Sequence, residues 1–182
     1  MNAHSNFLTH DLALEDSHLL FFHDDGRIPN SRLPVLVYHL RLKGGVDKAA
    51  AFEALFTQNN WNPLWRAGIF DYHHYHSNAH EALGVASGKA RVTLGGEAGQ
   101  TFRVKEGDVL VLPAGTGHRC IERSEDFLVV GAYPVGQENY DIQRPSVETH
   151  DASLACIAAV PLPTADPVTG PDGSLIEAWR RA

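Results

Sequence analysis

The sequence has few cysteines and no long apolar segment, and both absences narrow the classes of protein that it can belong to. Its 182 residues include two cysteines, which are too few for a disulfide framework. The apolar runs, such as residues 127–132, are far too short to span a bilayer, so we expect no membrane partner. No basic segment followed by an apolar run opens the chain, and we therefore expect a cytoplasmic location with reduced thiols.

Positive charge is also scarce. The formal net charge is −7, and lysine and arginine cluster only at Arg180 and Arg181. Because binding to a phosphate backbone needs a basic face, this composition argues against a nucleic-acid partner. The sequence also contains no Walker loop, dinucleotide-binding fingerprint or Cys-x-x-Cys pair.

Glycine and proline, in contrast, are abundant, with 16 and 10 residues. Between residues 65 and 133, short segments rich in valine, leucine, phenylalanine and tyrosine alternate with turn residues. Residues 90–94 and 101–104 flank a glycine-rich turn and are expected to form a hairpin. Such regularly spaced short strands predict an all-β antiparallel sandwich or closed barrel. We expect residues 1–182 to form a single domain whose barrel core covers about residues 62–135.

The segments that flank the barrel are predicted to form a helix and two arms. Residues 1–31 are expected to be a loosely ordered arm, and residues 47–59 show the apolar spacing of a helix. The tail, residues 134–182, is rich in proline, aspartate and glycine and is expected to wrap the barrel or a partner subunit. Trp61 and Trp65 are expected to pack between the helix and the barrel.

The most informative segment holds four histidines and one glutamate within residues 73–81. If this segment is extended, His74 and His76 point to the same side, and two imidazoles on one face can share one metal ion. Phe70 and Tyr72 have the same parity and are predicted to line the same cavity. We therefore name Tyr72 as a candidate catalytic residue that contacts substrate or delivers a proton. The alternative is a packed tyrosine with a hydrogen-bonded hydroxyl.

Two further residues can complete this site. Glu81 has the same parity as the apolar Leu83, which favours Glu81 over His80 as a ligand, although a bend between the two segments could reverse the parity. A second buried strand, residues 107–112, ends in a proline-containing turn that is followed at once by His118. That position allows His118 to close a metal site begun by the first histidines.

Together the two segments resemble the two sequence motifs of the cupin superfamily, G-x5-H-x-H-x(3,4)-E-x6-G and G-x5-P-x-G-x2-H-x3-N. The matching positions are Gly68, His74, His76, Glu81, Gly88, Gly107, Pro113, Gly115 and His118. Glu122 stands where the second motif has asparagine, a position that is not a metal ligand in the family. Most of the chain is also similar to single-domain bacterial cupins of uncharacterised role.

The resemblance implies an all-β jelly-roll barrel with an added N-terminal helix and terminal arms, assembled as a homodimer. The implied ligands of one divalent transition metal ion are His74, His76, Glu81 and His118. Three nitrogens and one carboxylate oxygen suit Fe, Mn, Ni, Co or Zn better than Ca or Mg. The implied function is a metal-dependent dioxygenase or isomerase of a small oxygenated molecule, with Glu81 also a candidate proton acceptor. A non-catalytic small-molecule binding or sensing module and a storage-like barrel remain as alternatives.

Overall fold

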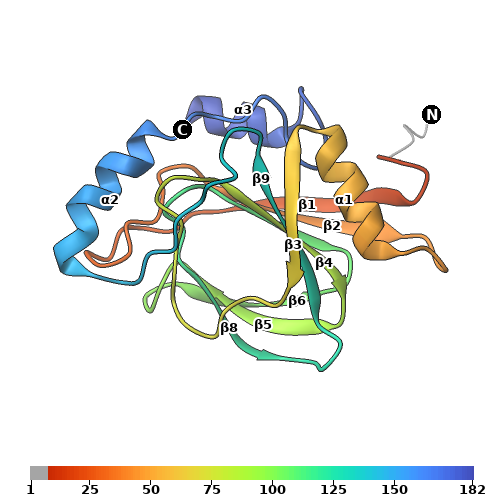
Figure 1. Cartoon of the computed structure of the whole chain (residues 1–182), viewed down its shortest axis with the longest axis horizontal. Coiled ribbons are helices and arrows are strands. Elements are labelled where there is room, and N and C mark those ends of the chain that lie inside the picture. The colour runs from red at the N-terminus through yellow and green to blue at the C-terminus, as the bar shows by residue number, and fades with distance from the viewer. Residues whose placement is uncertain (1–7) are drawn as a thin grey trace.

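The computed structural model describes residues 8–182, in which the chain forms nine strands and three helices (Figure 1). The strands are β1 (Leu12–Leu20), β2 (Val35–Leu42), β3 (Trp61–Ala67), β4 (Glu81–Ser87), β5 (Lys89–Leu94), β6 (Gln100–Lys105), β7 (Asp108–Leu112), β8 (His118–Arg123) and β9 (Leu128–Pro134). The helices are α1 (Lys48–Gln58), α2 (Val147–Ala159) and α3 (Ser174–Arg181).

The strands form two antiparallel sheets. The larger sheet has the order β1-β2-β7-β4-β9-β3, and the smaller sheet has the order β6-β5-β8. Figure 1 shows the smaller sheet on one side of the larger one, with α1 and α3 on the other side. The predicted hairpin is present as β5 and β6, and the all-β jelly-roll fold expected from the sequence is confirmed.

Strand β7 shows how the apolar residues divide between two cores. Val109 and Val111 pack on the outer face of the large sheet, in a cluster that includes residues of α1 and α3. Leu110 and Leu112 point the other way, into the cluster between the two sheets. Both faces of β7 are therefore covered, which explains its unbroken apolar sequence. Full burial of each such side chain contributes roughly 1.5–3 kcal/mol of transfer free energy.

Helix α1 occupies the position predicted for a helix. The Asp47 side chain caps it by accepting a hydrogen bond of 3.1 Å from the Ala50 N–H. Phe52 and Phe56 are fully buried against the large sheet. Gly84 of β4 allows this contact, because a Cβ at that position would lie 2.8 Å from the Phe52 ring.

The two arms are more ordered than the sequence suggested. Residues 1–7 lie outside the described part, but Leu12–Leu20 pairs with β2 as an edge strand, so the expectation of a loose arm was wrong there. The sequence contains no strand signal here, because this edge strand is largely exposed and carries polar residues such as Asp16 and Ser17. The tail wraps its own barrel, where Leu175 and Trp179 of α3 are buried.

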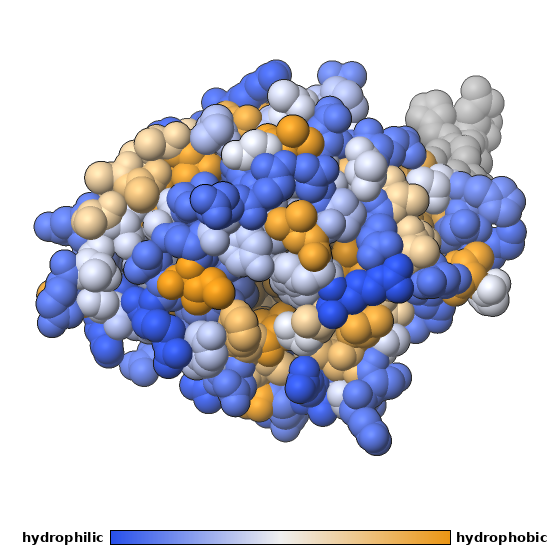
Figure 2. Space-filling model, viewed as in Figure 1, coloured by the Kyte–Doolittle hydropathy of each residue, from blue (hydrophilic) through white to orange (hydrophobic). Residues whose placement is uncertain are grey.

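Hydrophilic residues cover much of one face of the molecule (Figure 2). On the face shown in Figure 2, hydrophobic residues form small separate patches between hydrophilic ones. Patches of this kind are ordinary for a globular protein and need no further explanation. Within residues 8–182, no helix combines the length and the apolar character that crossing a membrane requires.

Candidate metal centre

Two backbone segments lie side by side and bring the three predicted histidines together. The His118 N–H donates to the His74 carbonyl oxygen over 2.9 Å, and the His74 N–H donates to the His118 carbonyl oxygen over 3.2 Å. The Gly115 N–H donates to the His76 carbonyl oxygen over 2.8 Å. Gly115 has a φ of +95°, and a Cβ there would lie 2.2 Å from the Asn30 carbonyl oxygen, so this turn requires glycine. The two sequence motifs therefore meet in one site.

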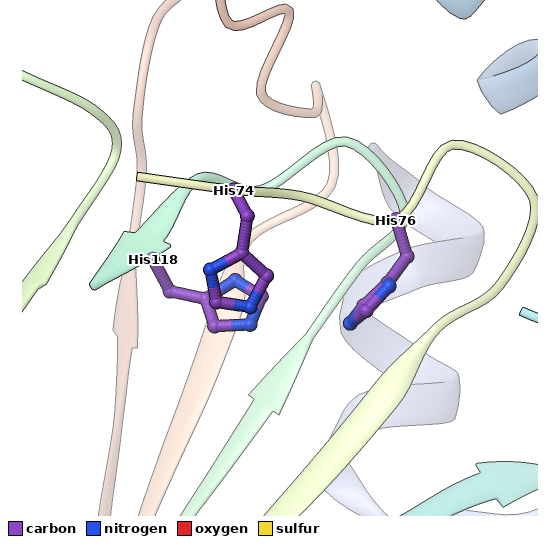
Figure 3. A group of neighbouring side chains, drawn as sticks. All are labelled: His74, His76 and His118. Atoms are coloured by element: carbon purple, nitrogen blue, oxygen red, sulfur yellow. The ribbon is translucent and has the colours of Figure 1, made fainter. Parts of the chain in front are cut away.

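Each of the three imidazole rings is held by a backbone carbonyl through its Nδ1 atom. The pairs are His74 with Tyr72 O (3.0 Å), His118 with Thr116 O (3.0 Å) and His76 with Asp141 O. Because a carbonyl only accepts hydrogen bonds, each Nδ1 carries a proton and each Nε2 is left to bind another group. One nitrogen from each ring lies within 4.8 Å of the others, and Figure 3 shows the rings gathered around one space.

Glu81, the first residue of β4, points into the same space. Its Oε1 atom lies 3.3 Å from His76 Nε2, and its Oε2 atom lies 3.1 Å from His118 Nε2. The residue is 2% exposed. The Tyr133 hydroxyl donates a hydrogen bond of 2.5 Å to Oε1. A carboxylate therefore lies beside the three imidazoles, held by a tyrosine from β9.

His80 points to the opposite side of the chain. Its Nδ1 accepts a hydrogen bond of 2.9 Å from the Ala114 N–H, and its ring centroid lies 4.6 Å from that of Trp179. Burial lowers the pKa of His80 to about 3, so the ring is neutral. The structure thus brings Glu81, and not His80, to the three histidines, which is the arrangement that strand parity favoured.

Burial and the mutual proximity of these groups set their protonation. Burial is the main cause that lowers the pKa of His74 to about 3, and the neighbouring His118 lowers it further. Burial alone would raise the pKa of Glu81, but His76 and His118 oppose that effect and hold the pKa well below its usual range. The site therefore contains an ionised carboxylate together with a neutral imidazole at His74.

Two atoms of this group have no hydrogen-bond partner among the described residues, namely His76 Nε2 and Glu81 Oε2. Both residues are at most 5% exposed, and an unpaired buried polar atom costs about 1–3 kcal/mol. Since the proton of each neutral imidazole is on Nδ1, each Nε2 carries a lone pair. The Nε2 atoms of His76 and His118 therefore face carboxylate oxygens that also carry lone pairs, and these contacts are repulsive. Either an additional proton or a cation must lie between them. The residues present fit a metal cation, and the buried histidine triad is able to bind one.

A cavity of about 210 Å³ lies beside these donors. Its other walls are mainly apolar and aromatic and include Ile69, Phe70, Leu83, Tyr140 and Ile142. Phe70 is 46% exposed, so it lies where the cavity meets solvent. A larger groove of about 730 Å³ lies between α2 and residues 21–33, but the metal-binding donors are in the smaller cavity.

Tyr72 lies next to this cavity but is not among the residues that line it. Its ring stacks on Phe70 with centroids 4.9 Å apart, and the Arg144 guanidinium lies 3.8 Å from its ring centroid. The Tyr72 ring also meets the edge of the His74 ring at 5.5 Å. Phe70 therefore lines the cavity as predicted, and the catalytic role of Tyr72 stays a prediction.

Sequence reasoning missed the contribution of β9 and misplaced one tryptophan. Trp65 was expected between the helix and the barrel, but it lines the cavity, and its Nε1–H donates to the Tyr133 hydroxyl over 3.0 Å. Gly131 permits this position, because a Cβ there would lie 2.1 Å from the indole ring. No local pattern marks Tyr133, since its role depends on β9 pairing with β4. Trp61 is fully buried beside α1, as expected.

Comparison with known proteins agrees with this geometry. The family model described as a cupin domain matches residues 67–130. The uncharacterised protein YjlB of Bacillus subtilis (strain 168) is 41% identical over 160 residues, which cover 87% of this chain and 94% of that protein. The chain belongs to the cupin family.

Similarity to solved structures is weaker. A double-stranded β-helix protein from Klebsiella pneumoniae gives a TM-score of 0.37 at 15% identity and covers 70% of this cupin and 75% of that chain. A mutant of Bacillus subtilis oxalate decarboxylase gives a TM-score of 0.35 at 20% identity and covers 61% of this cupin. The cupin described here spans only 22% of that chain.

Proposed function

We propose that this cupin is a metal-dependent enzyme, a dioxygenase or an isomerase, that acts on a small oxygenated molecule. One divalent transition metal ion is bound in the barrel, and its ligands are His74, His76, Glu81 and His118. The observation that carries the proposal is the convergence of one nitrogen from each of three imidazoles at the wall of a small cavity, with the Glu81 carboxylate beside two of those rings. Three nitrogens and one oxygen suit Fe, Mn, Ni, Co or Zn.

Such an ion supplies Lewis acidity and, if it is redox-active, reactivity toward O2. The cavity volume of about 210 Å³ limits the substrate, since sites for drug-sized ligands begin at about 300 Å³. The buried Leu83 gives the cavity one apolar wall, and the half-exposed Ile142 gives it another. A small molecule with oxygen atoms at one end satisfies both the donors and these walls.

Three residues of the chain control a proton beside the reacting centre. The Trp65 Nε1–H donates to the Tyr133 hydroxyl, which in turn donates to Glu81 Oε1. Burial and the charge of Glu81 raise the pKa of Tyr133 far above its usual range, so the hydroxyl keeps its proton. Glu81 is the residue that we propose as the acceptor of a proton from a substrate. We also keep Tyr72 as a candidate proton carrier at the cavity entrance.

Elemental analysis tests the metal ligands. We expect the wild-type protein to hold one more equivalent of Fe, Mn, Ni, Co or Zn than the His74→Ala/His76→Ala variant after identical dialysis. A His10→Ala/His23→Ala variant, which removes two exposed histidines, is the matched control and should keep this equivalent. Equal metal content in the wild type and the His74→Ala/His76→Ala variant, even after reconstitution, would remove the basis of the proposed enzyme.

Turnover tests the enzymatic part separately. The metal-loaded protein should consume O2 or interconvert isomers when it is given a panel of small hydroxy-acids, hydroxy-ketones and diones, followed by an oxygen electrode and by NMR. Glu81→Gln should lose turnover. Tight binding of a compound by the metal-loaded protein, without conversion of any compound on the panel, would instead identify a binding or sensing module.

Assembly and location are separate parts of the proposal. We propose a cytoplasmic homodimer that pairs through its sheets, because β1 and β3 are the edge strands of the large sheet in the described residues. Light scattering coupled to size-exclusion chromatography tests the dimer. A monomeric mass across a range of protein concentrations would contradict it.

A further inference from the structure

A second group of metal-binding side chains lies on β1 and β2, outside the barrel site. Asp16 and His39 are directly opposed in the β1–β2 ladder, and His18 follows Asp16 by two residues. One nitrogen of each ring and one carboxylate oxygen of Asp16 all lie within 4.8 Å of one another. The two ring centroids are 5.4 Å apart. Three side chains with metal-binding atoms thus share one face of a two-stranded ladder.

A β-bulge in β1 brings these residues to the same face. Leu14 pairs with Leu40 and Asp16 pairs with His39, so Glu15 is the additional residue of the bulge. In a regular ladder Glu15 would oppose His39, and both Asp16 and His18 would point to the other face. Bulges commonly re-aim side chains next to functional sites. The bulge is therefore the backbone feature that assembles the group.

A buried carboxylate holds His39 in a single orientation. Asp108 Oδ1 lies 2.7 Å from His39 Nδ1, and Asp108 is only 3% exposed. A carboxylate that accepts the Nδ1–H leaves the Nε2 lone pair free to bind a metal, as in carboxylate–histidine–metal arrangements. Asp16 Oδ1 accepts the Ser17 N–H over 2.7 Å, which leaves its other oxygen available. Two of the three side chains are thus already oriented.

We propose that Asp16, His18 and His39 form a second metal site, for a divalent ion of the zinc, nickel or copper class. Two imidazole nitrogens and one carboxylate oxygen are a ligand set that suits these ions. Because the ligands come from both strands, the ion fastens the edge strand β1 to β2. Asp16 and His18 are exposed, so the ion remains accessible from solvent.

Zinc titration of the full-length protein against a chromogenic chelator tests this site. Wild-type protein should bind two ions, whereas His18→Gln and Asp16→Asn should each bind one. His74→Ala/His76→Ala should also bind one, and the same protein with His18→Gln should bind none. His23→Gln, which changes an exposed histidine of the same arm, is the control and should keep both ions.

The possible outcomes separate the two sites. Loss of one ion in His18→Gln supports the inference even if the barrel variant loses nothing, so failure of the proposed enzyme would not be confused with failure of this site. Two ions of unchanged affinity in His18→Gln, or an equal loss in His23→Gln, would overturn it.

Hydrogen exchange supplies a second measurement. In the His74→Ala/His76→Ala protein, zinc should slow exchange of backbone amides in Leu12–Leu20, and adding His18→Gln should abolish the effect. Unchanged exchange in β1 at saturating zinc would overturn the proposed fastening of this strand.

Discussion

The Tyr133 hydroxyl donates a hydrogen bond of 2.5 Å to Glu81 Oε1, while Glu81 Oε2 has no hydrogen-bond partner in the described structure. The two carboxylate oxygens therefore have different surroundings. One is occupied by a tyrosine that keeps its proton, and the other faces the space between the imidazoles. Tyr133 thus fixes which oxygen is available to a metal ion, although it lies 52 residues away from Glu81 along the chain.

We expect Tyr133→Phe to weaken metal binding by about 10-fold or more, which is the size of effect that partners of metal ligands commonly have. The loss arises because Glu81 becomes free to rotate. Competition with a chelator measures it. Tyr75→Phe is the matched control, since the buried Tyr75 hydroxyl bonds to Ser153 of α2 outside the cavity. Equal affinities for Tyr133→Phe and the wild type would contradict the role of this hydroxyl.

Asp141 positions His76 from a neighbouring loop. Its carbonyl accepts from His76 Nδ1, and its carboxylate accepts from the Ser77 N–H over 2.6 Å and from Gln143 Nε2 over 2.9 Å. We expect Asp141→Asn to weaken metal binding several-fold, because an amide cannot accept all of these hydrogen bonds. Glu138→Gln changes an acid of the same loop and should leave metal binding unaltered in the same assay. Similar losses in both variants would indicate a general effect of the loop.

The buried Asp166 fastens the tail to the barrel. Its carboxylate accepts from the Tyr38 hydroxyl and from the Leu175 N–H, the latter over 3.0 Å at the start of α3. Because Asp166→Ala leaves several buried donors unpaired, it should lower the free energy of unfolding by about 3 kcal/mol or more. Urea denaturation measures the change, with the exposed Asp172→Ala as a control. A change below about 1 kcal/mol for Asp166→Ala would be inconsistent with this anchoring.

We expect the stability of the protein to depend on pH through His150 of α2. Its Nε2 lies 2.8 Å from both carboxylate oxygens of Asp24 and its Nδ1 lies 3.2 Å from Asp151 Oδ1, and these contacts raise its pKa, Asp24 most. A raised pKa in the folded state stabilises the protein below the unfolded value of about 6.5, and this contribution is lost as pH rises through the folded value. His150→Gln should therefore lower the urea midpoint at pH 5.5 but not at pH 9.

A double-mutant cycle with Asp24→Asn checks the origin of this effect. At pH 5.5 the two single variants should lose similar stability, and the double variant should lose little more. Fully additive losses would show that the two side chains act independently.

The sequence predicted the barrel and the four residues that the structure brings together in it. Because side chains alternate along an extended backbone, spacing placed His74 and His76 on one side of their segment. On the next strand, the parity that Glu81 shares with the apolar Leu83 favoured Glu81 over His80. The order of elements also placed His118 directly after a turn, where a strand that returns beside the first segment can present it. These features depend on residues close together in the sequence, so the local amino-acid pattern can predict them.

The distant residues that complete each site depend on how the strands pack together. Tyr133 reaches Glu81 because β9 pairs with β4, and His39 meets Asp16 because a bulge at Glu15 changes the face to which Asp16 points. Likewise, residues 12–20, which the sequence suggested were part of a loose arm, form β1 because they pair with β2. The alternation of side chains along a strand indicates on which face of the strand a residue lies. It does not state which strand lies alongside or where the ladder slips by one residue, because those depend on the packing of the whole chain.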